Sequence, residues 1–172
     1  MQAYFRRLGP SSFRATDHVG GACQDHEQHI APALGLLAHL VELDHRARRK
    51  DELRLVRLCY DILGTMAVDI VETNVTVLRA GRTIELVEAR MAQNGRDAVS
   101  LRAWLLDRRD TSALQDTLLP AIPGPHEVPE WGPTSFWPGG FIRSAQVRRE
   151  LLTPGRGTSW VTTDVPRSRA SR

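Results

Sequence analysis

Residues 31–46, which read APALGLLAHLVELDHR, decide the fold. From Ala31 to Leu43 only His39 and Glu42 are strongly polar, so the apolar residues are not confined to a single stripe. A helix with this pattern is expected to be buried on nearly every side. Pro32 falls in the first turn, where a missing N–H does no harm. The stretch therefore predicts one long helix at the centre of the protein.

Three segments that follow the helix alternate apolar with polar residues, which is the period of a half-buried strand. They cover residues 71–77, 83–92 and 99–105. Residues Arg79–Arg82 separate the first two, and Asn94-Gly95 separates the others and is a strong hairpin signal, because both residues tolerate positive φ. A fourth apolar run, Leu53–Leu63, precedes them. These segments predict an α+β fold in which an antiparallel sheet curls around the helix.

The flanking segments add shorter strands and a linker. Strands are expected at 4–8 and 13–18 before the helix, and at 141–151 and 158–165 near the C-terminus. The Pro-rich segment between the sheet and the last strands predicts a linker, in which Trp131, Phe136 and Trp137 indicate packing on a surface. We predict a domain over 1–108, a linker over 109–140, the start of an incomplete second domain over 141–166 and a disordered tail over 167–172.

Composition argues against several classes of function. The net charge is +3, and Lys50 is the single Lys in a chain whose positive charge is otherwise Arg. Because acidic residues are interspersed with the basic ones, no nucleic-acid interface is expected. Cys23 and Cys59 lack metal-ligand spacing, and neither a metal nor a cofactor is expected. The longest apolar run, 31–41, is shorter than the roughly 20 residues that span a bilayer. These features predict a cytoplasmic protein without membrane contact.

Six segments carry a resemblance to a known family. They are Gly20-Gly21, 28–37 (QHIAPALGLL), 58–64 (LCYDILG), 77–83 (VLRAGRT), 137–140 (WPGG) and 160–166 (WVTTDVP). In this order they resemble the acyl-CoA thioesterase II-like family, whose members contain two hot-dog domains in tandem. The resemblance implies an antiparallel sheet wrapped around one helix. It also implies hydrolysis of fatty acyl-CoA thioesters, as part of fatty acid metabolism, by an activated water.

The resemblance places the catalytic carboxylate of such proteins in the second hot-dog domain. This chain ends before the helix of a second domain, so we carry over no carboxylate from that half. The expected partners are an acyl-CoA substrate and a second copy, because hot-dog domains pair sheet to sheet. Two functions stay open: a thioesterase, and a non-catalytic module that binds acyl groups or forms oligomers.

The polar segment before the helix holds the candidate catalytic residues. Thioester hydrolysis needs a base for water and donors for the developing oxyanion, and the N–H groups of a helix N-terminus suit the second task. Asp25 or Glu27 is a candidate base, Gln28 can orient water or the carbonyl, and His29 can donate or shuttle a proton. The alternative is structural: acidic residues here stabilise the helix by about 0.3–1 kcal/mol each, and Gln28 and His29 cap it.

A hot-dog hydratase is a second enzymatic interpretation, because such enzymes pair an Asp and a His near this helix. Their usual pattern places the His five residues after the Asp, with Asn-Pro between them. In this chain the spacing from Asp25 to His29 is four residues and Asn-Pro is absent. The pattern therefore favours a thioesterase.

Three further residues are candidates for substrate binding. Gly21, with Gly20, either supplies positive φ for a turn or lets the backbone approach a substrate closely. Asp61 lies in an otherwise apolar segment and so faces either solvent or a ligand cleft. Arg57 can contact CoA phosphates or solvent. Cys59 is expected to be a small buried residue rather than a nucleophile.

Overall fold

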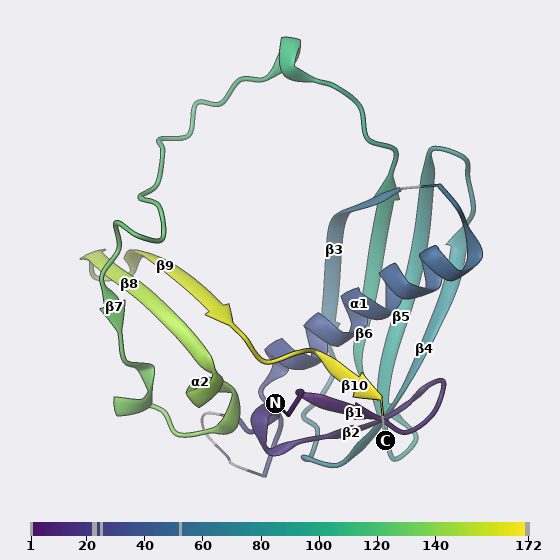
Figure 1. Ribbon diagram of the computed structural model, residues 1–172, viewed down its shortest axis with the longest axis horizontal. Coiled ribbons are helices and arrows are strands. Elements are labelled where there is room, and N and C mark those ends of the chain that lie inside the picture. The colour runs from purple at the N-terminus through teal and green to yellow at the C-terminus, as the bar shows by residue number, and fades with distance from the viewer. Residues whose placement is uncertain (1, 22–23, 25, 52, 171–172) are drawn as a thin grey trace.

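The computed structural model describes residues 2–21, 24, 26–51 and 53–170. Within them, one sheet of order β10-β1-β2-β4-β5-β6-β3 curls around a long helix, and a smaller sheet, β7-β8-β9, follows beyond a long linker (Figure 1). The strands are β1 (Phe5–Arg7), β2 (Ser12–Ala15), β3 (Arg54–Ile62), β4 (Ile70–Arg79), β5 (Ile84–Gln93), β6 (Arg96–Leu106), β7 (Glu130–Trp131), β8 (Ala145–Thr153), β9 (Arg156–Thr163) and β10 (Ser168–Ala170). The helices are α1 (Ile30–Arg48) and α2 (Gly140–Ser144), with 3₁₀ turns η1 (Asp17–Val19), η2 (Ser112–Leu114) and η3 (Pro133–Ser135).

The central helix is α1, which confirms the helix predicted over 31–46. One face is buried against the sheet, with Ala33, Leu36, Leu37 and Val41 at helical spacing. Ala31 to Glu42 are all buried or half-buried, as the apolar run predicts, and Leu43, at 39% exposure, is the first exposed residue of the helix.

The three predicted hairpin strands form the centre of the sheet as β4, β5 and β6. Asn94 and Gly95 turn the chain between β5 and β6 with φ of 53° and 76°. Alternate residues of β5, among them Val87, Ala89 and Met91, are fully buried in the core around α1. The period of two in the sequence therefore marks the face that the helix covers.

The edge strand β3 leaves apolar surface uncovered. It pairs with β6 alone among the described strands, with Leu58 opposite Ala103 and Ile62 opposite Val99. Ala103 and Val99 are fully buried in the core, so Leu58 and Ile62 face the same side of the sheet as α1. They are nevertheless 41% and 58% exposed. We call Leu58 and Ile62 the edge strip; it lies along the free edge of the sheet.

Two predictions for the C-terminal part are wrong. The strand expected over 141–151 begins as the short helix α2 and becomes a strand at Ala145. The tail expected to be disordered forms β10, which pairs in parallel with β1. The N–H groups of Tyr4 and Phe5 donate to the carbonyls of Pro166 and Arg167 and bring the two segments together. The predicted limits of the domains and of the linker stay predictions.

Candidate functional site

A frame of backbone hydrogen bonds fixes the N-terminal end of α1. His29 N donates to the Val19 carbonyl at 2.7 Å, and Gln28 N donates to the Met66 carbonyl at 2.8 Å. Gly21 N donates to the Glu27 carbonyl at 2.7 Å. The structure thus brings together three of the predicted site residues, Gly21, Gln28 and His29, which we call the collar.

His29 is the N-cap of α1, as the structural alternative predicts. Its Nδ1 accepts a hydrogen bond from the Ala31 N–H at 3.2 Å. Because an amide N–H can only donate, Nδ1 carries no proton, and the ring is neutral with its proton on Nε2. Burial lowers the pKa of His29 below its ordinary value, which favours the same neutral form. Nε2 has no hydrogen-bond partner among the described residues, so capping leaves one donor free.

Gln28 likewise uses one of its two polar side-chain atoms in a hydrogen bond and leaves the other without a partner. Its Nε2 donates to the Ala67 carbonyl at 2.8 Å, while its Oε1 is a buried atom without a hydrogen-bond partner among the described residues. Gln93 holds the same segment, because its Oε1 accepts from the Ala67 N–H at 2.7 Å. The amide is thus fixed through its Nε2 donor, and the acceptor capacity of Oε1 is not used by the described residues.

The helix N-terminus offers fewer backbone donors than its position suggests. The Ala31 N–H is bonded to His29 Nδ1, and Pro32 has no N–H. Among the first three residues of α1, only Ile30 keeps an N–H without a partner among the described residues. Of the backbone donors expected at this helix N-terminus, the Ile30 N–H remains available, and the His29 Nε2–H is a side-chain donor at the same end.

Glycines at the collar allow close backbone approach. The described glycines with positive φ are Gly95, Gly139 and Gly155, so the prediction of positive φ at Gly20-Gly21 is wrong. Gly21 is instead buried, and a Cβ there would lie 3.1 Å from the Glu27 carbonyl oxygen. A Cβ at Gly139 would overlap the carbonyl of Gly21, and one at Gly140 would overlap that of Asp17. These contacts explain why the segments Gly20-Gly21 and WPGG occur together.

Phe141 packs against the collar and was not among the residues predicted from the sequence. Its ring stacks on the His29 imidazole with centroids 4.2 Å apart and planes at 20°. Its N–H donates to the Gly20 carbonyl at 3.1 Å. Beside this pair lies a cavity of about 380 Å³, lined among others by Tyr4, Pro32, Gly35, Phe141 and Thr163. The WPGG motif was a signal for Phe141, but nothing in it specifies the partner ring.

The other candidate residues lie elsewhere or outside the described residues. Asp25, the leading candidate base, falls outside them. Arg57 and Asp61 pair with Trp104 and Ser100 on the face of the sheet opposite α1, where both are exposed. Cys59 shares that face, so the expectation of a buried thiol is wrong. The alternation of β3 turns these three polar residues away from the helix.

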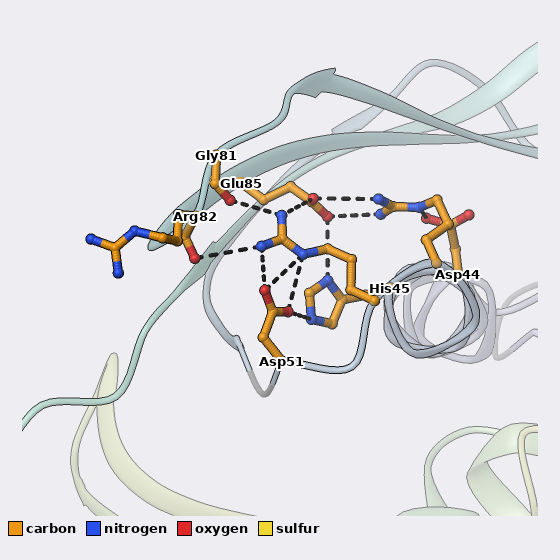
Figure 2. Close-up of polar contacts among 8 residues, drawn as sticks. Asp44, His45, Asp51, Gly81, Arg82 and Glu85 are labelled. Carbon is orange, nitrogen blue, oxygen red and sulfur yellow. Dashed lines mark hydrogen bonds and ion pairs between the residues drawn. The ribbon is translucent and has the colours of Figure 1, made fainter.

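A second cluster of ionisable residues lies at the C-terminal end of α1 (Figure 2). Glu85 of β5 is fully buried there, and both of its oxygens are bonded. Arg48 Nη2 donates to Oε1 at 2.7 Å, and Arg49 Nη1 donates to Oε2 at 3.2 Å. His45 Nδ1 lies 3.4 Å from Oε1. The acidic residue at an inward position of β5 was the available signal in the sequence.

The partners of Glu85 are themselves tied to the surrounding loops. Arg49 donates to the Gly81 carbonyl at 2.7 Å and pairs with Asp51. His45 Nε2 lies 3.2 Å from Asp51 Oδ1 without the alignment of a hydrogen bond. Burial raises the pKa of the Glu85 carboxyl, but hydrogen bonds from Arg48 and His45 outweigh it and hold the pKa below its ordinary value. With both oxygens occupied, Glu85 is a structural clamp rather than a base.

Two classes of site receive no support from the described part of the chain. No group of three or more His, Cys, Asp or Glu residues there is arranged to hold a metal ion. None of the described helices combines the length and the apolar character needed to cross a bilayer.

Solved structures share the fold. A hot-dog protein of unknown function from Alicyclobacillus acidocaldarius matches 92% of this chain and 60% of its own, with a TM-score of 0.63 and 14% identity. The tesB protein of Mycobacterium avium subsp. paratuberculosis matches 93% of this chain and 58% of its own, with a TM-score of 0.60 and 15% identity. This chain thus spans about three fifths of the length of these neighbours. No curated protein matches it in sequence.

A family match in sequence agrees with the fold. The family described as acyl-CoA thioesterase N-terminal domain matches residues 18–106, just over half of the 172-residue chain. The matched region runs from η1 through β6 and so includes α1 and the collar. This protein has the hot-dog fold and belongs to the acyl-CoA thioesterase N-terminal domain family.

Proposed function

We propose that this protein hydrolyses fatty acyl-CoA thioesters at the collar. The observation that carries the proposal is the bonding of His29: Nδ1 is committed to Ala31, so the neutral ring presents Nε2–H as a donor. A fixed neutral donor suits a carbonyl oxygen that gains negative charge in the transition state. The family match supports the substrate class, because its description names acyl-CoA.

The roles follow from what each group can donate or accept. Water attacks the thioester carbonyl carbon while the Asp25 carboxylate takes a proton from it, and Gln28 Oε1 orients that water by accepting its other hydrogen. The carbonyl oxygen becomes an oxyanion that accepts from His29 Nε2–H and the Ile30 N–H. As the carbonyl re-forms, the C–S bond breaks, and the CoA thiolate takes up the proton held by Asp25. The products are a fatty acid and free CoA.

The cavity beside Phe141 supports an apolar acyl group. Its volume of about 380 Å³ falls in the range of small-molecule sites, and Pro32, Gly35 and Phe141 contribute apolar wall. Arg57 and Asp61, on the opposite face of the sheet, take no part in the proposed chemistry.

The direct test is release of CoA from a panel of acyl-CoAs, measured by thiol detection. The informative variant is His29→Asn, because Asn also caps helices but is too short to place an N–H where Nε2–H lies. We expect a loss in kcat on the order of 10²–10³-fold. His39→Asn, on the same helix and away from the collar, is the control. A His29→Asn protein with unchanged turnover contradicts the role of His29.

We also propose that the protein self-associates through β3. The edge strip is exposed on β3, which pairs with β6 alone among the described strands and can pair with the same strand of a second copy. The strip also favours the non-catalytic alternative, a module that only binds acyl groups or assembles. An inert protein that still dimerises would support this alternative against hydrolysis.

Light scattering coupled to size-exclusion chromatography tests the assembly. Ile62→Lys places a charge on the edge strip and is expected to shift the protein toward monomer. Val161→Lys on β9 is the matched control, because Ile62 and Val161 are both 58% exposed. Equal masses for wild type and Ile62→Lys would contradict pairing through β3.

A further inference from the structure

Phe141 reaches the collar from outside the family-matched region. It lies on α2, beyond residues 18–106, yet its ring covers one face of the His29 imidazole. Centroids 4.2 Å apart with planes at 20° describe a nearly parallel stack, which restricts rotation of the imidazole about its Cβ–Cγ bond. The segment after the linker therefore contributes an aromatic ring that packs against the collar.

Backbone contacts fix Phe141 on the side of η1. Its N–H donates to the Gly20 carbonyl, and Gly139 and Gly140 lie against the carbonyls of Gly21 and Asp17 without room for a side chain. Any displacement of Phe141 therefore requires this backbone contact to open.

A chain of hydroxyl groups fixes Phe141 on the opposite side. Ser144 Oγ donates to the Phe141 carbonyl at 2.7 Å. Because that hydrogen is used, the Tyr4 hydroxyl, 2.7 Å away, donates to Ser144 Oγ, and Thr163 Oγ1 at 2.8 Å donates to Tyr4. Tyr4, in the middle of the chain, is 3% exposed, whereas Thr163 at its end is exposed. The chain of hydroxyl groups connects the N-terminal segment, α2 and β9 behind Phe141.

We propose that Phe141 is a positioning residue that acts through His29. Its ring holds the imidazole in the orientation in which Nδ1 accepts from Ala31 and Nε2–H is free to donate. The inference rests on the proposed function for its catalytic meaning, but the stack acts on His29 whether or not the protein is a hydrolase.

The contact has a consequence for proton binding. A proton on Nδ1 would face the Ala31 N–H donor to donor and break the cap, and the stacked ring excludes water that would solvate the imidazolium. The described ionisable residues on the surrounding segments are Tyr4, Asp17, His18, His26, Glu27, Arg143, Asp164 and Arg167. None of them forms a hydrogen bond or ion pair with His29.

The test is an NMR titration of the His29 ring in the whole chain. Phe141→Ala is expected to move the titration midpoint upward, toward the ordinary value of 6.5. Phe141→Tyr, which keeps the ring face, is expected to restore the wild-type midpoint. Phe136→Ala is the matched control: Phe136 is another aromatic residue after the linker, but it stacks on Trp131. If Phe141→Ala does not fold, Phe141→Leu keeps apolar volume, removes the ring face and is expected to show the same rise.

The outcomes separate this inference from the proposed function. A His29 midpoint that is unchanged in folded Phe141→Ala or Phe141→Leu overturns the positioning role, even if the protein hydrolyses acyl-CoA. A midpoint that rises supports it, even if no acyl-CoA is hydrolysed. In an active protein, the pKa read from the acid limb of the pH–rate profile should shift upward together with the NMR midpoint, because the neutral ring is the active form.

Discussion

The two ends of α1 differ in how far the hydrogen-bonding atoms of their polar side chains are occupied. At the C-terminal end, both oxygens of buried Glu85 are bonded by Arg48 and Arg49. At the N-terminal end, Gln28 Oε1 lacks a partner among the described residues, and His29 uses only one ring nitrogen. A carboxylate whose two oxygens are both bonded can stabilise the fold but has no free acceptor left for chemistry. The unpartnered atom of this cluster, His45 Nε2, lies beside Asp51. The difference supports the proposal that the N-terminal end is the functional one, because His29 keeps a fixed donor there that the fold does not use.

Removing the charge at the C-terminal end should have the largest effect on stability. Glu85→Ala leaves two arginines and His45 without their shared carboxylate, and we expect a loss of about 3–5 kcal/mol in the free energy of unfolding. Urea denaturation measures it. Glu88→Ala is the control on the same strand, because Glu88 faces Arg90 at the surface, where a pair contributes about 0–1 kcal/mol. Equal losses in the free energy of unfolding for the two variants would contradict a stabilising role of the cluster around Glu85.

The contact between Gly140 and Asp17 gives the next largest effect. Gly140→Ala introduces a Cβ that overlaps the Asp17 carbonyl, and overpacking of this kind costs about 1–3 kcal/mol. It should also raise the His29 titration midpoint, because α2 must move. Gly155→Ala, at φ 78° with open space around it, is the control and should cost about 1 kcal/mol without any change at His29. An unchanged His29 titration midpoint in Gly140→Ala would contradict a contact in which α2 controls the environment of the collar.

Acid titration should distinguish the two ends by a smaller effect. The pKa of His29 is lowered on folding, so the unfolded chain binds its proton first and stability falls as pH drops below 6.5. The pKa of Glu85 is lowered from 4.5, so its contribution is complete above that pH and is lost as pH falls further. In thermal melts at a series of pH values, His29→Asn should therefore reduce the loss of stability that begins near pH 6.5. Glu85→Gln should reduce the loss that begins near pH 4.5. If either variant instead reduced the loss of stability assigned to the other residue, the contrast between the two ends of α1 would be contradicted.

Local sequence patterns predicted the frame of the protein. The apolar run gave α1, alternation gave β4 to β6, and Asn94-Gly95 gave the turn between two of them. Each of these features depends on neighbouring residues and needs no knowledge of distant contacts. The position of Gln28 and His29 at the start of the helix was predictable for the same reason, because they directly precede it in the sequence. Their role at a site stays a prediction.

The remaining features depend on contacts between distant segments. Phe141 lies 112 positions after His29 in the printed sequence, and no local pattern records that their rings stack. The pairing of Ser168–Ala170 with β1 likewise joins the two ends of the described chain. Glu85 had a local signal, a charge at an inward position, but its partners come from the far end of α1. Tertiary contacts decided each of these outcomes.

The protonation pattern of the His29 ring tests the central claim most directly. Long-range ¹H–¹⁵N spectra of the wild-type chain at pH 7 distinguish a bare nitrogen from a protonated one. The bonding of His29 predicts a bare Nδ1 and a protonated Nε2. A ring that carries its proton on Nδ1, or on both nitrogens, would contradict the assignment of this end of α1 as the donor site.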